Sequence, residues 1–181
     1  MKYYKEISLK DGRPCVIRNA SEEDAKGVLD NFILTHGETD FLTSYPDECT
    51  FTLEGEEKYM KYKEESLKEV EIIAVVDGKV TGTAGINSLG SCDKVKHRAS
   101  FGISVAKEYW NLGIGRAMMA ACLECAKEAG YLQVELEAVA DNKAALSLYE
   151  SFGFTEYGRN PKGFRSRYTG WQPTVLMRLE L

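Results

Sequence analysis

The segment from residue 97 to 140 constrains the fold of this chain more than any other. The stretch KVKHRASFGISVA predicts a strand, and YWNLGIGRAMM (109–119) then places two glycines before a run of good helix formers. Gly130 ends this predicted helix, and YLQVELEAVA follows with apolar residues at alternate positions, which predicts a second strand. The order strand, helix, strand predicts two parallel strands joined by a right-handed crossover.

Gly113 and Gly115, at the start of the predicted helix, have two physical interpretations. Glycine tolerates positive φ, so the pair is typical of an ordinary turn. The start of a helix also leaves amide groups unpaired and carries a partial positive charge, so glycines there let a phosphate approach the backbone. The pattern differs from a dinucleotide-binding or Walker loop, because it has no third glycine and no Gly-Lys-Ser/Thr sequence.

Further elements precede this unit. The Asp-Gly pairs at 11–12 and 77–78 are turn signals between apolar runs, which predicts an antiparallel hairpin around each. Between them, a helix begins after Ser21, residues 36–53 predict a loop, and residues 54–69 predict an exposed helix. The apolar positions expected to be buried are Ala25, Val28, Leu29, Phe32 and Ile33 in the first helix and Tyr59, Tyr62 and Leu67 in the second.

After the unit, Asp141 and Asn142 cap a helix that ends at Gly153, and FTEYGR and TVLMRLEL predict two strands around a basic loop. The fold class is therefore α/β in the broad sense, an α+β mixed sheet in which antiparallel hairpins flank one central parallel pair. Because no repeat or linker occurs, residues 1–181 predict a single domain, with residues 1–14 as an N-terminal hairpin extension.

Composition excludes several classes of function. No apolar run approaches the roughly 20 residues of a membrane span, and the polar stretch MKYYKEISLKDGRP is no secretory signal. Five scattered cysteines predict reduced thiols and a cytoplasmic location, and Cys122 and Cys125 are expected to be buried helix residues rather than metal ligands. The net charge of −5 argues against nucleic acid as a partner, and no metal site is predicted.

Two motifs in the central segment resemble those of a known family. The first has the family form Gln/Arg-x-x-Gly-x-Gly/Ala and occurs as WNLGIG, with Trp110 at the Gln/Arg position. The second, Asn-x-x-Ala-x-x-Leu-Tyr-x-x-x-Gly-Phe, is complete between Asn142 and Phe154. From about Ile17 to its C-terminus the chain resembles the GCN5-related N-acetyltransferases, the GNAT family, with residues 101–154 as the acetyl-CoA-binding core.

The resemblance implies an enzyme that transfers acetyl from acetyl-CoA to a primary amine, with two parallel strands that splay apart around the pantetheine arm. It implies that Tyr149 points its hydroxyl at the thioester sulfur and that Asn142 hydrogen-bonds the cofactor arm. The backbone of 103–105 would pair with the pantetheine, and the amides of 112–116 would bind the pyrophosphate. The cofactor-binding residues that it implies are Ile103, Ser104, Val105, Leu112, Gly113, Ile114, Gly115, Arg116, Asn142 and Ala145.

These residue types fit acetyl transfer on chemical grounds as well. Backbone amides can stabilise the oxyanion of the tetrahedral intermediate. A phenol with a pKa of about 10 is protonated at pH 7 and can give its proton to the departing thiolate. Tyr149 would otherwise be a packed aromatic residue and Asn142 only a helix cap, but within the complete motif we favour the catalytic role of Tyr149.

The sequence leaves the general base open. An ammonium group with a pKa of about 10.4 must lose a proton before its nitrogen can attack. Some family members carry a glutamate early in the strand before the glycine turn, but the matching stretch HRASF has no carboxylate. Three candidates remain: His97, Glu137, and a water chain that ends at a backbone carbonyl.

The acceptor is predicted from charge. Residues 37–57 contain seven acids and no Lys or Arg, whereas residues 158–167 contain four basic residues and no acid. An acidic block beside the cleft would attract a cation, so a cationic small molecule such as a polyamine is expected. The alternative acceptors are an aminoglycoside-like drug, an amino acid and a protein N-terminus of the ribosomal-protein type. The alternative functions are a non-catalytic acetyl-CoA-binding module and a nucleotide-binding domain. A homodimer is compatible with the sequence.

Overall fold

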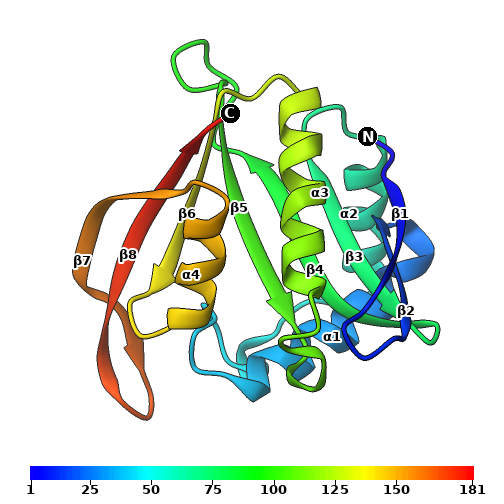
Figure 1. Ribbon diagram of the computed structural model, residues 1–181, viewed down its shortest axis with the longest axis horizontal. Helices are drawn as coiled ribbons and strands as arrows, with labels where there is room; N and C mark the ends of the chain where they lie inside the picture. The colour runs from blue at the N-terminus through cyan, green and yellow to red at the C-terminus, as the bar shows by residue number, and fades with distance from the viewer.

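The predicted strand–helix–strand unit forms the centre of the structure (Figure 1). In the computed structural model, which describes residues 1–181, β5 (Arg98–Val105) and β6 (Gln133–Val139) are parallel and α3 (Ile114–Glu128) connects them. The two strands pair only where Arg98–Ser100 meets Gln133–Glu135. Beyond that point they diverge, which confirms the predicted pair of splayed strands.

The sheet has eight strands in the order β1-β2-β3-β4-β5-β6-β8-β7, and every pair except β5–β6 is antiparallel. This confirms the mixed sheet predicted from the hairpins and the single parallel unit. The other strands are β1 Tyr4–Ser8, β2 Pro14–Asn19, β3 Val70–Val76, β4 Lys79–Ser88, β7 Thr155–Ser166 and β8 Gly170–Glu180. The other helices are α1 Ala25–Glu38, α2 Leu53–Glu65 and α4 Lys143–Ser151, with short 3₁₀ turns at Glu22–Asp24, Pro46–Glu48 and Lys107–Tyr109.

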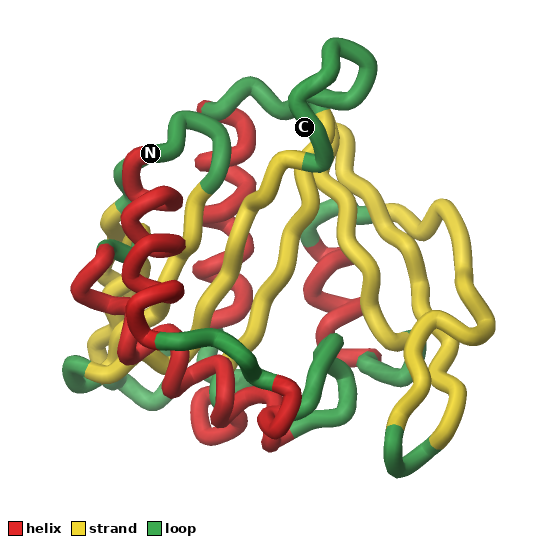
Figure 2. The backbone as a smooth tube through the Cα atoms, turned by 180° about the vertical axis from the view of Figure 1, so that it is seen from behind, coloured by secondary structure: helices red, strands yellow, loops and turns green.

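Helices cover both faces of the sheet. α3 packs on one face, in a core of 29 buried residues that includes Ile72, Met118 and Val134. α1 and α2 lie on the other face, where Figure 2 shows them in front of the strands. Beneath them is a smaller core cluster of Ala20, Ala25, Val28, Met60 and Ile73. In both views α4 lies beside the gap between β5 and β6 (Figures 1 and 2).

α1 buries a different face from the one predicted. Ala25 and Val28 are buried as expected, but Leu29 and Phe32 are only half-buried and Ile33 is 44% exposed. Further along the helix the buried positions are polar, and two of them, Thr35 and His36, line cavities rather than the apolar core. These polar positions are Asn31, Thr35 and His36.

The apolar stripe predicted for α2 is wrong at Tyr59, Tyr62 and Leu67. These three side chains are at least 40% exposed, and Met60 and Lys63 are buried in their place. Lys63 is buried together with its charge, because its Nζ lies 3.1 Å from a carboxylate oxygen of Glu69. An ion pair of this kind gives no apolar periodicity in the sequence.

Two boundaries also differ from the prediction. α1 runs through Glu38, so the loop predicted over 36–53 begins later, and it contains the 3₁₀ turn at Pro46–Glu48. The segment 158–167, predicted as a basic loop, lies within β7 except for its last residue. Its proline and glycine are tolerated in a strand because the pairing with β8 is interrupted between Asn160 and Phe164.

All five cysteines are free, and Cys122 and Cys125 are buried in α3 as expected. No group of three or more His, Cys, Asp or Glu side chains is arranged to hold a metal ion. A membrane crossing would need a longer and more apolar helix than any in this structure.

Candidate active site

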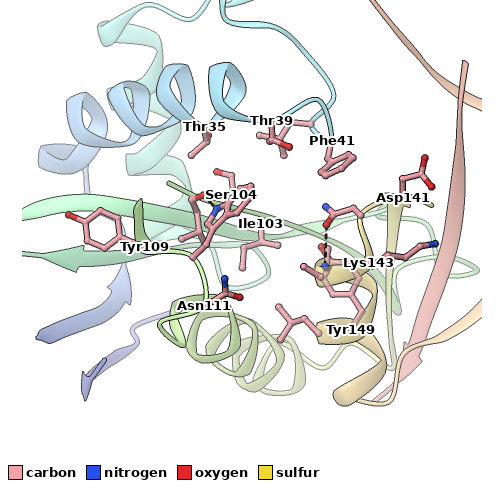
Figure 3. A pocket seen from close by; sticks show the side chains of 18 residues that line it. Thr35, Thr39, Phe41, Ile103, Ser104, Tyr109, Asn111, Asp141, Lys143 and Tyr149 are labelled. Carbon is pink, nitrogen blue, oxygen red and sulfur yellow. Dashed lines mark hydrogen bonds between the residues drawn. The ribbon is translucent and has the colours of Figure 1, made fainter. Parts of the chain in front are cut away.

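A cavity of about 450 Å³ lies where β5 and β6 separate (Figure 3). Four segments line it: the end of β5, the turn before α3, the start of α4, and the end of α1 with the loop that follows. The structure places seven of the eleven predicted site residues in the lining of this cavity. They are Ile103, Ser104, Val105, Gly115, Asn142, Ala145 and Tyr149.

The turn before α3 presents a row of unpaired amides. None of the backbone N–H groups from Asn111 to Arg116 donates to a backbone carbonyl. Gly113, the N-cap of the helix, has φ +102°, a conformation that favours glycine, whereas Gly115 faces the cavity. Unpaired amides and the positive end of the helix dipole together favour binding of a phosphate group here.

Trp110 connects this turn to the end of β5. Its indole Nε1 donates a 2.6 Å hydrogen bond to the carbonyl of Val105, the last residue of the strand. Trp110 therefore positions the glycine turn relative to the strand edge, a role that could not be inferred from its departure from the family motif. The same bond engages one of the carbonyls that the resemblance assigns to the pantetheine.

β5 presents an unpaired edge to the cavity. Residues Ile103–Val105 pair with Gly82–Ala84 of β4 on one side. On the other side β6 has already diverged, so this edge has no partner strand. An unpaired edge can form backbone hydrogen bonds with an extended ligand that contains amides.

Tyr149 is packed and also forms part of the cavity wall. Its side chain is 7% exposed, and its ring meets that of Phe101 edge-on with centroids 6.2 Å apart. Burial raises the pKa of Tyr149 to about 12, so its hydroxyl is protonated at neutral pH. Figure 3 shows Tyr149 across the cavity from Thr35 and Thr39. Its position is compatible with both interpretations, packing and proton donation.

Asn142 caps α4. Its Oδ1 accepts a hydrogen bond from the backbone amide of Ala145 at 3.2 Å, which confirms the cap (Figure 3). The cap uses only the oxygen of this side chain, so Nδ2 can still donate to a ligand in the cavity that Asn142 lines. That second contact stays a prediction.

Four predicted residues do not line the cavity: Leu112, Gly113, Ile114 and Arg116. Ile114 is 1% exposed and packs in the core. The guanidinium of Arg116 turns toward α4, where it donates to the hydroxyl of Ser151 at 2.9 Å. These positions can therefore contribute backbone amides, but the side chain of Arg116 is engaged elsewhere.

Neither side chain predicted as a general base lines the cavity. His97 precedes the end of β5 that pairs with β6, and its carbonyl accepts from the amides of Leu132 and Gln133. Glu137 on β6 accepts a hydrogen bond from the hydroxyl of Thr174 on β8. The cavity begins at the opposite end of β5 from His97, so its position argues against His97 as the base.

A comparison with known families identifies the chain. The sequence profile described as the acetyltransferase (GNAT) family matches residues 38–154, which contain the glycine turn and the whole of the second motif. The chain belongs to the GNAT acetyltransferase family. Acetyl-CoA is the cosubstrate of GNAT enzymes, and a solved structure of yncA, a putative acetyltransferase from Salmonella typhimurium, contains it.

Solved structures confirm the GNAT fold. A GNAT-family acetyltransferase from Streptococcus pneumoniae superposes with a TM-score of 0.88 at 26% identity, over 92% of this chain and 99% of that protein. The yncA protein superposes with a TM-score of 0.79 at 20% identity, over 92% of this chain and 94% of its own.

Curated relatives differ in what their names say they acetylate. An N-alpha-acetyltransferase from Sulfurisphaera tokodaii is 32% identical over 126 residues, 62% of this chain and 72% of its own length. The L-amino acid N-acyltransferase MnaT from Escherichia coli is 24% identical over 110 residues, 61% of this chain and 63% of its own. The probable N-acetyltransferase camello from Xenopus tropicalis is 37% identical over 82 residues, 45% of this chain, but the match spans only 36% of its own length.

The acidic and basic segments of this GNAT protein contact each other. The guanidinium of Arg167 lies 2.7 Å from a carboxylate oxygen of Asp47 and 3.1 Å from one of Glu48. Nearby, Asp40 accepts a 3.1 Å hydrogen bond from Gln172 of β8. These contacts attach the loop after α1 to the β7–β8 hairpin, and they neutralise part of the acidic block on which the acceptor prediction rests.

Two parts of the site could not be predicted from the sequence. Thr39, Phe41 and Leu42 of the loop after α1 line the cavity without any motif or periodicity (Figure 3). A second cavity of about 230 Å³ adjoins the first and is lined by Glu71 and His36 among others. Both side chains lie outside the family motifs, so no sequence signal indicated them.

Trp110→Phe is expected to raise the Kd of CoA about fivefold, because the variant keeps an aromatic ring but loses one hydrogen bond worth about 1 kcal/mol. Isothermal titration calorimetry measures the change. Trp171→Phe is the control, since Trp171 lies on β8 outside the cavity and is 53% exposed. Equal Kd values for the two variants would show that Trp110 does not position the glycine turn.

Proposed function

We propose that this protein transfers acetyl from acetyl-CoA to a primary amine by direct attack, with a cationic small molecule such as a polyamine as the acceptor. The observation that carries the proposal is the convergence of three groups on one cavity: the turn before α3, which lines it at Asn111 and Gly115, the open edge of β5, and Tyr149 with its protonated hydroxyl. Each group matches one need of acetyl transfer.

The role of each group in the reaction follows from its position. Acetyl-CoA, when bound, supplies an acetyl group activated as a thioester. The amides of 112–116 would bind the pyrophosphate, and Ile103–Val105 would hold the pantetheine arm. A backbone amide at this edge can stabilise the negative charge that develops on the carbonyl oxygen. Tyr149 would donate its proton to the sulfur as the C–S bond breaks.

The choice of acceptor rests on charge. Asp47 and Glu48 are paired with Arg167, so their contribution to the attraction of a cation is reduced. The formal charge of −5 and the carboxylate of Glu71 in the second cavity still favour a cation over an anion. An N-terminal peptide amine is the second candidate, because relatives include an N-alpha-acetyltransferase and a ribosomal protein bS18-alanine N-acetyltransferase.

CoA release is expected to be fastest with spermidine in a panel that also contains an N-terminal peptide, an amino acid and an acidic amine of similar size. The kcat/KM for spermidine should decrease when the salt concentration is raised from 0.1 M to 1 M, because the Debye length shrinks from about 10 Å to about 3 Å. The measurement is thiol release with each amine at both salt concentrations.

The outcomes of this panel separate the candidates. Release with the peptide alone would assign an N-terminal acceptor, and a preference for the acidic amine would contradict the cationic one. If acetyl-CoA binds and no amine releases CoA, the protein is a binding module rather than an enzyme.

A further inference from the structure

The second cavity lies on the face of the sheet that α1 and α2 cover. It shares Leu42, Ile103 and Ser104 with the first cavity, so the two meet at the end of β5. The first cavity holds the groups that we assign to acetyl-CoA. The second therefore approaches the same strand from a different side and has room for another reactant.

A row of three residues crosses the sheet beneath this cavity. Glu71 of β3 pairs with Gly85 of β4, and Gly85 pairs with Gly102 of β5. Residues directly opposite each other in a sheet share a face, so all three face the cavity that they line. A Cβ on Gly85 would lie 2.7 Å from Oε2 of Glu71, which shows that the carboxylate lies over this glycine.

The space above Gly102, the last residue of this row, is open. A Cβ on Gly102 would meet no atom within 4 Å, and this glycine is exposed. Neighbouring strands lie about 4.8 Å apart, so a small group above Gly102 would lie between the carboxylate and the last residues of β5. The two glycines thus leave a trough that leads from Glu71 toward the place proposed for the thioester.

The charges around Glu71 favour a cation. The lysine near Glu71 is Lys63. Its side chain is only 1% exposed, and its Nζ lies 3.1 Å from a carboxylate oxygen of Glu69, so its charge is already paired. Burial raises the pKa of Glu71 from its ordinary 4.5 to about 7, an effect that Lys63 opposes and Glu56 reinforces. The pKa of the partly buried Tyr59 of α2 is raised first by its partial burial and then by the nearby charge of Glu71. Glu69 and Glu71 therefore share one buried ammonium, and Glu56 adds a further negative charge near Glu71.

His36 of α1 is the other titratable group on the wall of this cavity. Its Nδ1 lies 2.7 Å from the carbonyl oxygen of Phe32, which can only accept, so Nδ1 carries the hydrogen. Burial lowers the pKa of His36, so the ring is neutral at pH 7. A neutral His36 adds no positive charge that could hold the carboxylate of a substrate.

We infer that Glu71 is the general base of this enzyme and that the second cavity holds an acceptor amine without a neighbouring carboxylate, an assignment that rests on the proposed acetyl transfer. The carboxylate of Glu71 takes one proton from the acceptor ammonium, and the free lone pair forms the C–N bond. The C–S bond breaks, and the sulfur receives the Tyr149 proton. The nitrogen then loses its second proton, which restores the tyrosine hydroxyl, and Glu71 releases its proton to water.

Glu71→Gln tests the base directly. With the best amine from the panel, the variant is expected to lose at least tenfold in kcat/KM at pH 8. The wild type should show kcat/KM rising with an apparent pKa near 7, and the variant should lack this rise. CoA affinity should be unchanged. Glu137→Gln is the matched control, because it removes a carboxylate from β6 outside both cavities and should keep the wild-type profile.

Substrate pairs test the acceptor class. Cadaverine and lysine differ only by the α-carboxylate, and kcat/KM is expected to be at least tenfold higher for cadaverine, because the cavity offers no free cation to the carboxylate. Equal values for the two amines would overturn the assignment of the acceptor.

Thermal unfolding provides a readout that does not depend on activity. The folded protein holds the Glu71 proton more tightly than the unfolded chain does, so ionisation of Glu71 lowers stability as the pH rises through about 7. Glutamine cannot ionise, so the Tm of Glu71→Gln minus that of the wild type should increase between pH 5 and pH 8.5. No increase would show that Glu71 ionises as it does in water.

The failures are distinguishable. A wild type that releases no CoA with any amine would remove the proposed acetyl transfer itself. An active wild type whose pH profile survives in Glu71→Gln but is lost in His36→Gln would transfer the role of base to His36. A profile that survives in both variants would leave proton removal to water and overturn the inference.

Discussion

Replacing Tyr149 by phenylalanine is expected to lower kcat by about 10²-fold or more while the Kd of CoA changes less than about twofold. The variant keeps the ring, which meets Phe101 edge-on and fills the wall of the cavity, and removes only the hydroxyl. Without that proton donor the departing thiolate must be protonated by water. Steady-state kinetics and calorimetry on the same preparation separate the two effects.

Tyr131→Phe is the matched control for this experiment. Tyr131 is also buried, with 2% of its surface exposed, but it lies after α3 and lines neither cavity. Its variant should keep wild-type kcat. Because burial raises the pKa of Tyr149 to about 12, kcat of the wild type should show no decline from loss of this proton below about pH 11. An undiminished kcat in Tyr149→Phe would leave the residue with a packing role alone.

The parts of the site that could be predicted from sequence are those that a local backbone conformation requires. Asp77 and Gly78 both have positive φ, at 50° and 75°, which is why an Asp-Gly pair indicates a hairpin turn. Gly113 likewise needs its left-handed φ at the N-cap of α3, and Asn142 accepts the Ala145 amide only three residues away. In each case neighbouring residues determine the structure, so the sequence carries the signal.

The second cavity could not be predicted, because it depends on the register of three strands. Glu71 faces a trough only because Gly85 and Gly102 lie opposite it in successive strands, and no periodicity along the chain encodes that alignment. The burial of Lys63 against Glu69 is of the same kind, since a charged residue on a helix is normally expected in solvent. For the same reason the sequence indicates His97 and Glu137 as candidate bases and gives no signal for Glu71.

The beginning of β7 was predicted as a strand, but the rest of it was predicted as a loop for a different reason. The segment GRNPKGFRSR (158–167) has the proline, glycines and charges of a loop. In the structure, the pairing with β8 continues on both sides of an irregular stretch, and Arg167 just beyond the strand forms ion pairs with Asp47 and Glu48. Long-range contacts thus determine a conformation that local propensity argues against.

The glycine turn gives the second large effect that we expect. Gly115→Val should raise the Kd of CoA at least tenfold in a folded protein, because the added atoms enter the cavity where the amides are expected to meet the pyrophosphate. Within the protein a Cβ at this position lies 3.5 Å from Leu148 and 3.9 Å from Ile103, which are ordinary contacts, so the fold should tolerate the change. Calorimetry with CoA measures the affinity, and circular dichroism checks the fold.

Gly113 allows a second test of the glycine turn, because a side chain here is disfavoured by the backbone conformation and not by contacts within the protein. A Cβ here meets no protein atom within 4 Å, but φ +102° makes any side chain strained, at a cost of about 1–2 kcal/mol. Gly78→Ala is the matched control, since Gly78 also has positive φ and open space but lies in the β3–β4 turn outside both cavities. Both variants should lose similar stability in thermal unfolding, and only Gly113→Ala should lose CoA affinity, because strain at this residue shifts the row of amides that follows it. If CoA affinity were unchanged in Gly113→Ala and in Gly115→Val, the pair would be an ordinary turn, and the phosphate would have to bind elsewhere.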